Sequence, residues 1–327
     1  MPMTALSLAG RVMLFVLFIL VLPDRASAQG TCSATSTDII FGNVDTLTAN
    51  ATLTTGTITV TCNVTLSVLG SRSLTVRLGP GSGGTSGGTR LMRSPATQTS
   101  LGYQLFSDAA RTQVFGGLGS VGGQGITLSG NNFLSVIGTT VIPITIYGRI
   151  PGNQSGVAPG AYASTFQPPL DIRIDWQICN VLGALCSSGT IGAPFTVRAQ
   201  VQPNCLVSAT DLNFGNTGIL SAAIDASSQI EVVCTTNSPY QIGLSGGLHA
   251  TVALGRRMQG APGNFVEYQL FRDASRTQSW GAAGSGLSQS GTGGGTGQVY
   301  PVFGRVPAQT TPPAGTYRDT VIVTVTY

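Results

Sequence analysis

The stretch YQLFRDASRTQSWG, residues 268–281, has a second version earlier in the chain: YQLFSDAARTQVFG, at residues 103–116. The two versions are identical at ten of fourteen positions, at an offset of 165 residues. In each version the tyrosine and leucine of YQLF fall on one face of an alternating pattern, which predicts a short strand. The polar residues that follow predict a turn leading into a second short strand. A phrase of this length, repeated in one chain, predicts two copies of one β-rich folding unit.

The parallel between the two halves continues on both sides of this phrase. Shared landmarks, in the same order, are FGN (residues 41–43 and 214–216), a methionine (Met92 and Met258), YGRIP and FGRVP (147–151 and 303–307), and GAY and GTY (160–162 and 315–317). Short alternating runs are separated by Gly, Pro and Ser clusters, and no 3.6-residue period persists beyond the N-terminal apolar run. This pattern predicts an all-β fold of two β-sandwiches. We place the units at residues 29–203 and 204–327.

The N-terminus predicts export. The apolar run VMLFVLFILVL (residues 12–22) precedes Ala26-Ser27-Ala28, a small-x-small cleavage site, so we expect a signal peptide over residues 1–28. The run is too short to span a membrane comfortably. Charged residues make up only 9% of the chain, and all sixteen basic residues are arginine. Their dispersal provides no footprint for nucleic acid and no polybasic patch for a membrane surface.

Six cysteines in an exported chain predict disulfides. Cys32 and Cys205 each stand nine residues before an FGN motif, and Cys62 and Cys234 each end the next predicted strand. The repeat therefore predicts the equivalent bonds Cys32–Cys62 and Cys205–Cys234, and elimination pairs Cys179 with Cys186. A zinc site is not expected, because there is no CxxC motif and only one histidine, His249.

No residue pattern predicts an enzyme or a cofactor site. His249 has no acidic residue within ten positions, which favours a lone surface histidine over the base of a Ser/His/Asp triad. Asp171 and Asp175 fall on one predicted strand face with Arg173, which favours a solvated, charge-balanced surface over a pair of catalytic carboxylates. Asp108 and Asp273 recur beside Arg111 and Arg276 in the two copies, and we expect a turn-stabilising Asp–Arg contact. The motif Gly117-x-Gly119-x-x-Gly122 is not followed by a helical pattern, so it does not predict a dinucleotide site.

The landmarks together resemble one family. The succession Cys…FGN…strand-Cys…YQLF-x-D…R-T…[YF]-G-R-[IV]-P…G-x-Y is similar to that of spore coat protein U domains, which also form the subunits of archaic, Csu-type chaperone–usher pili. The resemblance covers both halves, more strongly over residues 205–327 than over 32–176, and a chain of two such domains resembles the tip adhesin of those pili. It implies incomplete immunoglobulin-like sandwiches, a periplasmic chaperone, an outer-membrane usher and no enzyme activity.

Two segments near cysteines bear on how such a subunit would assemble. An incomplete sandwich invites a strand from another chain, and donating one takes roughly ten alternating residues ahead of the first cysteine, about 33 Å when extended. Cleavage before Gln29 would leave three residues ahead of Cys32, so we expect a chain that accepts a strand from the next subunit but cannot donate one, as a pilus tip requires. Ahead of Cys205, residues 194–202 alternate with Phe195, Val197, Ala199 and Val201 on one face. We expect them to complete the first domain in cis; the alternative is an ordinary linker strand belonging to the second domain.

Two further segments carry functional expectations. The final run places Val321, Val323, Val325 and Tyr327 on one face, which the resemblance makes the chaperone-facing C-terminal strand. The short loop between Cys179 and Cys186 holds the apolar residues Val181, Leu182 and Leu185, either as an adhesive finger or as a cap on one end of the sandwich. The sequence together with the resemblance thus predicts an adhesive pilus-tip subunit at the cell surface. The resemblance alone implies a role in surface attachment and biofilm formation. The alternative is a secreted coat or matrix protein that is not part of a pilus.

Overall fold

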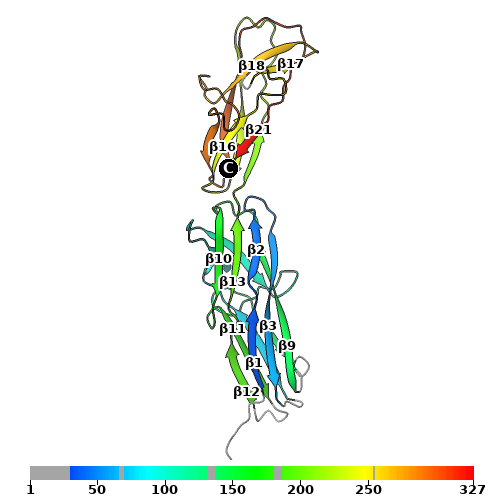
Figure 1. Ribbon diagram of the computed structural model, residues 1–327, viewed down its shortest axis with the longest axis vertical. Helices are drawn as coiled ribbons and strands as arrows, with labels where there is room; N and C mark the ends of the chain where they lie inside the picture. Colours follow the sequence, from blue (N-terminus) through cyan, green and yellow to red (C-terminus); the bar gives the residue numbers. More distant parts are fainter. Residues whose placement is uncertain (1–29, 66–69, 131–133, 135–136, 180–185, 253–254) are drawn as a thin grey trace, which may run out of the picture.

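The computed structural model describes the whole chain except residues 1–29, 66–69, 131–133, 135–136, 180–185 and 253–254. The described residues contain strands and no helix, so the predicted all-β class is confirmed. The molecule is elongated, with two domains arranged end to end (Figure 1). Each domain has its own hydrophobic core: one is built from residues between Ile39 and Val201, the other from residues between Leu220 and Val306. The expected signal peptide lies outside the described residues.

Domain one contains the first thirteen strands. They are β1 (Gly30–Ser36), β2 (Ile39–Val44), β3 (Thr52–Val64), β4 (Arg72–Leu78), β5 (Thr85–Ser86), β6 (Thr89–Arg93), β7 (Ser100–Phe106), β8 (Ile126–Ser129), β9 (Gly138–Ile150), β10 (Gly160–Phe166), β11 (Ile172–Cys179), β12 (Cys186–Ile191) and β13 (Phe195–Val201). One sheet has the order β1-β3-β9-β7-β6-β10-β13-β2, with β5 paired to β6, and the facing sheet has the order β12-β11-β4-β8. All pairs are antiparallel except β13 with β2.

Domain two repeats this plan with fewer strands. They are β14 (Cys205–Ala209), β15 (Ile224–Cys234), β16 (Pro239–Leu244), β17 (Arg256–Gln259), β18 (Phe265–Phe271), β19 (Gln289–Thr292), β20 (Gln298–Val306) and β21 (Val323–Thr326). The sheet orders are β14-β15-β20-β18-β17 and β19-β16-β21. Register proves the equivalence: Arg90 pairs with Tyr103 in domain one, and Arg256 pairs with Tyr268 in domain two.

The three disulfides join the pairs expected from the repeat and by elimination. Cys32 lies directly opposite Cys62 on β1 and β3, with 4.1 Å between the Cα atoms, and Cys205 lies opposite Cys234 on β14 and β15 at the same Cα separation. Cys179 and Cys186 join β11 to β12 across 4.0 Å. Each disulfide therefore links two neighbouring strands of one domain covalently.

The turn after YQLF is stabilised by its aspartate, but through backbone amides. The Asp108 carboxylate accepts hydrogen bonds from the amides of Thr112 and Gln113, at 3.0 and 2.7 Å, and from the Thr112 hydroxyl. Asp273 does the same in domain two. The sequence suggested a contact between the Asp and Arg side chains; instead the Arg111 side chain reaches away from Asp108, to the carbonyl oxygen of Gly148. A carboxylate that collects nearby amides closes the turn without a cation.

Candidate functional site

Strand β13 belongs to the core of domain one. It lies between β10 and β2, antiparallel to the first and parallel to the second (Figure 1). Its alternate side chains are buried, with exposed fractions between 0 and 6%: Phe195, Val197, Ala199 and Val201. The outward-facing Arg198 pairs with Asp38, and the Thr196 amide donates to the Asp38 carboxylate at 2.8 Å. Residues 195–201 thus pair with strands of domain one. That residues 194–202 act as a donor strand in cis stays a prediction.

The inward-facing residues of β13 lie opposite inward-facing residues of β10, its neighbour in the same sheet. Phe195 is opposite Phe166, Val197 is opposite Ser164, and Ala199 is opposite Tyr162. The two phenylalanine rings stack with centroids 4.5 Å apart. The Tyr162 hydroxyl donates to the Ala158 carbonyl oxygen at 2.7 Å, which fixes the position of the ring. All three side chains on β10 are 0 or 1% exposed.

The matching segment of domain two is residues 315–321, which we call the acceptor edge. Arg318 pairs with Gln259 as Ala163 pairs with Arg93, so Tyr317, Asp319 and Val321 correspond to Tyr162, Ser164 and Phe166. Within the described part of domain two, no strand lies on the other side of the acceptor edge. Its inward side chains are only half-buried, whereas their counterparts in domain one are fully buried.

The other strand next to β13 is β2, and its counterpart in domain two is also less buried. Ile39 and Phe41 of β2 are 0 and 7% exposed. Their counterparts, Leu212 and Phe214, are half-buried, and residues 211–218 form no strand. Leu212 and Phe214 still pack above Gly304, as Phe41 packs above Gly148. Both flanks of the β13 position therefore exist in domain two, but the position between them is not occupied by any described residue of this chain.

A buried polar cluster lies behind the acceptor edge. Arg256 is 1% exposed and donates to the carbonyl oxygens of Ser245, Leu244 and Trp280 at 2.8 to 3.1 Å. The Tyr268 hydroxyl donates to Asp319 at 2.7 Å. Burial lowers the pKa of Arg256, and burial together with the Asp319 bond raises the pKa of Tyr268. At neutral pH Arg256 is therefore a cation and Tyr268 a neutral phenol.

Domain one holds the same arginine and tyrosine with a different third member. Arg90 donates to the carbonyl oxygens of Gly79 and Phe115, and burial lowers its pKa to about 10. Burial raises the pKa of Tyr103 to about 12. Ser164 stands where domain two has Asp319. Sequence reasoning missed this cluster, although Arg90 and Arg256 each stand two residues before the matched methionine of the repeat.

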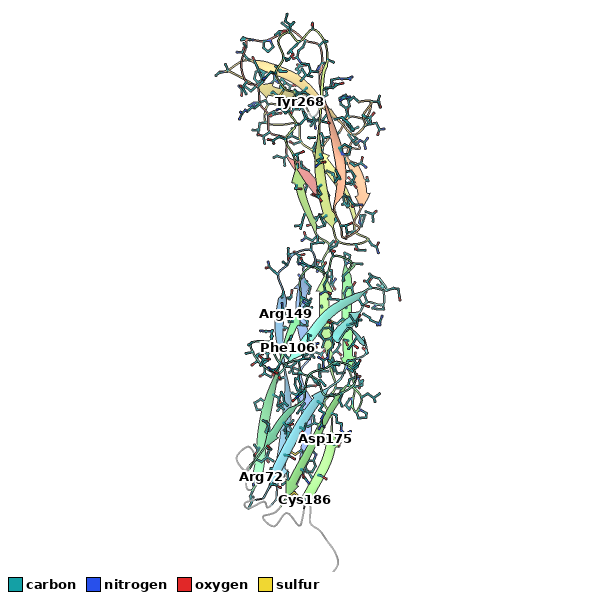
Figure 2. All side chains as sticks on the ribbon, turned by 180° about the vertical axis from the view of Figure 1, so that it is seen from behind. Arg72, Phe106, Arg149, Asp175, Cys186 and Tyr268 are labelled. Atoms are coloured by element: carbon teal, nitrogen blue, oxygen red, sulfur yellow. A yellow bond between two sulfur atoms is a disulfide. The ribbon has the colours of Figure 1, made fainter. Side chains whose placement is uncertain are left out.

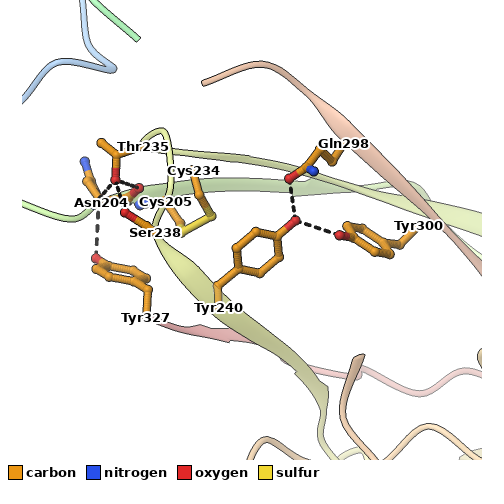
Figure 3. The surroundings of a disulfide bond; sticks show 9 residues. All are labelled: Asn204, Cys205, Cys234, Thr235, Ser238, Tyr240, Gln298, Tyr300 and Tyr327. Carbon is orange, nitrogen blue, oxygen red and sulfur yellow. Dashed lines mark hydrogen bonds between the residues drawn. A yellow bond between two sulfur atoms is a disulfide. The ribbon is translucent and has the colours of Figure 1, made fainter. Parts of the chain in front are cut away.

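The last strand returns toward the junction between the domains, where the C-terminus lies (Figure 1). Val321, Val323 and Val325 pack partly buried against the core of domain two, and Tyr327 is 53% exposed. The Tyr327 hydroxyl lies 3.4 Å from the Asn204 side chain, beside the Cys205–Cys234 bond (Figure 3). Asn204 also donates to Asp45 of domain one at 3.1 Å, so the linker is fixed on both sides.

The remaining candidate residues do not form a site. His249 is in a loop before β17, with its ring centroid 6.1 Å from that of Phe265. Asp175 binds Arg77 and Arg173, whereas Asp171 precedes β11 and accepts from the Gly81 amide. Asp175 lies in domain one, distant from Tyr268 (Figure 2). The apolar residues Val181, Leu182 and Leu185 lie outside the described residues.

Two other kinds of site were sought in the described residues. No group of three or more His, Cys, Asp or Glu side chains there is arranged to hold a metal ion. The described portion of the chain also contains no helix long and apolar enough to cross a membrane.

Comparison with known proteins identifies the repeated unit. The model of the Spore Coat Protein U domain matches residues 19–167 and again residues 191–324. The chain belongs to the spore coat protein U family. Protein U of Myxococcus xanthus is 32% identical over 154 residues, which cover 45% of this chain and 79% of that protein.

The spore coat U fold of this chain also has a solved counterpart. It is similar to a chain in the crystal structure of the CsuC–CsuE chaperone–tip adhesion subunit pre-assembly complex, from the archaic chaperone–usher Csu pili of Acinetobacter baumannii. The TM-score is 0.54 at 22% identity, over 91% of this chain and 100% of that one. This likeness is one of fold. Neither the family nor this structure is described as an enzyme.

Proposed function

We propose that this protein is the adhesive tip subunit of a chaperone–usher-type pilus, assembled by donor-strand complementation. Domain one is the outward, adhesive domain, and its β13 acts as a donor strand supplied in cis. Domain two accepts a strand from the N-terminal extension of the next pilus subunit. A periplasmic chaperone holds domain two before assembly, and an outer-membrane usher takes the complex to the cell surface. The subunit then serves surface attachment and biofilm formation, with no enzymatic step.

One observation supports this proposal above the others. The two domains share a strand register but differ on one side: β13 stands between β10 and β2, whereas no described strand pairs with the acceptor edge. Unpaired amides and carbonyls on a strand edge are templates for another strand, and strand addition is a recurring mode of protein–protein recognition. The half-buried Tyr317 and Val321 add apolar surface that such a strand would cover.

The chaperone and the next subunit would act on the same part of domain two. We propose that the chaperone contacts the strand face formed by Val321, Val323, Val325 and Tyr327, because β21 pairs with β16 on one side only among the described residues. The CsuC–CsuE structure, similar in fold, is that of a chaperone–tip adhesion subunit pre-assembly complex. For adhesion itself, the sequence points to the loop closed by Cys179 and Cys186. Leu182→Asp with Leu185→Asp is expected to abolish attachment while pili still form, and unchanged attachment would contradict that role.

The proposal is tested by producing residues 29–203 and 204–327 separately in a periplasm without the chaperone. We expect a soluble, protease-resistant first fragment, because it contains its own β13. The second fragment is expected to be degraded unless a donor peptide is supplied. A first fragment ending at residue 193 should lose its resistance, which serves as the control for β13.

A secreted coat or matrix protein is the second candidate, favoured by the identity with Protein U. In that case both domains would be complete without a partner strand. Two equally stable fragments, neither responding to donor peptides, would support this candidate and contradict the pilus-tip proposal.

A further inference from the structure

In domain one, β13 fills a strand position, and the structure shows which side chains lie beside it. Domain two has equivalent residues next to that position, and we call these flanking residues the wall in each domain. Arg90 pairs with Tyr103 as Arg256 pairs with Tyr268, and Leu78 pairs with Ile172 as Leu244 pairs with Val323. The side chains of β13 can therefore be placed against the acceptor edge position by position. Differences between the two walls then specify what the incoming strand must carry.

Tyrosine marks one position in both walls. The Tyr162 hydroxyl is held by the carbonyl four residues earlier, at 2.7 Å, and the Tyr317 hydroxyl is held by Pro313 in the same way at 2.7 Å. A ring fixed at this place leaves little room across the strand, and the residue opposite Tyr162 is Ala199. The residue opposite Tyr317 must therefore also be small, because close-packed interiors do not absorb an added side chain.

At the second inward-facing position after this tyrosine, four residues further along the chain, the two walls differ. Phe166 fills domain one and stacks on Phe195, with an interplanar angle of 8°. Domain two has Val321 there, which removes a ring from the wall while keeping the buried arginine behind it. A void of that kind costs packing energy unless the partner fills it. The residue opposite Val321 is thus expected to be aromatic, at the position that Phe195 holds in domain one.

The length of the partner strand follows from the path of the wall. In domain one, β10 and β11 are interrupted by residues 167–171, and their partners β13 and β12 are separated by residues 192–194. In domain two residues 315–322 form only an isolated bridge at Arg318, but no extra residues intervene: burial alternates from Tyr317 through Val325, and β21 begins two residues after Val321. Val325 lies four positions after Val321. In domain one, Ile191 lies four positions before Phe195 and pairs with Ile174, which is the residue that corresponds to Val325.

We infer that domain two accepts one straight strand, antiparallel to residues 315–325, with an aromatic side chain opposite Val321 and a small side chain opposite Tyr317. The inference rests on the proposed acceptor role of domain two and specifies the partner strand. At alternate positions, the incoming strand must carry an aromatic, an apolar, a small and an apolar residue, in this order. It must also carry an apolar residue four positions before the aromatic one.

The test uses the chain from residue 29 to 327 and synthetic peptides. The parent peptide has the sequence of residues 191–201 with Gly192→Thr and Pro194→Thr, because proline lacks an amide donor and glycine weakens a strand. Three single variants are compared with it: Phe195→Ala, Ala199→Phe and, as an outward-facing control, Arg198→Ala. Affinity is measured by calorimetry, and hydrogen exchange of residues 315–325 and of β10 shows which domain is occupied.

We expect the parent and the Arg198→Ala peptide to bind with equal affinity and to protect residues 315–325 without changing β10. The Phe195→Ala and Ala199→Phe peptides should each bind at least tenfold more weakly. If all four peptides bind domain two equally, the inferred register and side-chain requirements are wrong, while the acceptor role stands. If none of the four protects residues 315–325, and a panel of other alternating apolar peptides also fails, the acceptor role itself is contradicted.

Discussion

Phe195 stacks face to face on Phe166, with ring centroids 4.5 Å apart and both side chains almost completely buried. The pair joins β13 to β10 across 29 positions of sequence, from a segment that stands just ahead of domain two. It places residues 195–201 inside the first core. The stability of domain one should therefore depend on a segment that could be mistaken for a linker.

Phe195→Ala is expected to destabilise domain one by about 3–5 kcal/mol, the usual cost of emptying a buried aromatic site. Denaturant unfolding of the full chain, followed by signals assigned to each domain, measures the effect. Thr196→Ala, on the outward face of the same strand, should change stability by less than about 0.5 kcal/mol. Equal effects of the two changes would show that β13 is not part of the core.

Arg256→Met should destabilise domain two by about 3 kcal/mol, because it leaves three carbonyl oxygens without their buried donor. Arg318→Met, on the exposed side of the acceptor edge, is the matched control and should have little effect. Thermal unfolding of the full chain distinguishes the two variants. A tolerated Arg256→Met would mean that the buried arginine is dispensable for the fold.

The Cys205–Cys234 bond closes a separation of 29 residues in the smaller core. Replacing both cysteines by alanine is expected to lower the stability of domain two by about 3–4 kcal/mol in the chain-entropy model. The same double change at Cys179 and Cys186, separated by 7 residues, should cost domain one less. Unfolding curves of the two variants test the ranking, and a larger loss from the short loop would contradict it.

Acid should weaken both turns that follow YQLF. The Gln113 amide, with Thr112, holds the pKa of Asp108 below its usual value; the Ser275 hydroxyl and the Gln278 amide hold that of Asp273 well below it. A depressed folded-state pKa means that the unfolded state binds more protons, so this stabilisation is complete above the unfolded pKa of about 3.9 and is lost as pH falls toward the folded values. Asp273→Asn should flatten the loss of domain-two stability below pH 4. An unchanged pH profile would show that the turn does not depend on this charge.

Much of the architecture followed from local patterns. The repeated phrase at residues 103–116 and 268–281 predicted two equivalent units. Alternation predicted strands near residues 195–201 and 321–327, and the second strand is shorter than expected, at Val323–Thr326. Two disulfide pairs, Cys32–Cys62 and Cys205–Cys234, followed from the order of the repeat, because equivalent cysteines occupy equivalent strands, and Cys179–Cys186 followed by elimination. The turn chemistry was predicted less well: Asp108 recurs with Arg111, but a carboxylate beside free amides has nearer partners than an arginine side chain.

The sequence by itself determined the all-β class, the two spore coat U units and the residues that face inward on each strand, since alternation and repetition are local properties. Only the tertiary structure decided where β13 inserts, between β10 and β2 of domain one, and which edge of domain two remains uncovered. An alternating segment specifies two faces but not its neighbours, because strand pairing joins residues far apart in the chain. The buried Arg90 and Arg256 became evident for the same reason: their partners are carbonyl oxygens on other strands and loops, which no local pattern identifies.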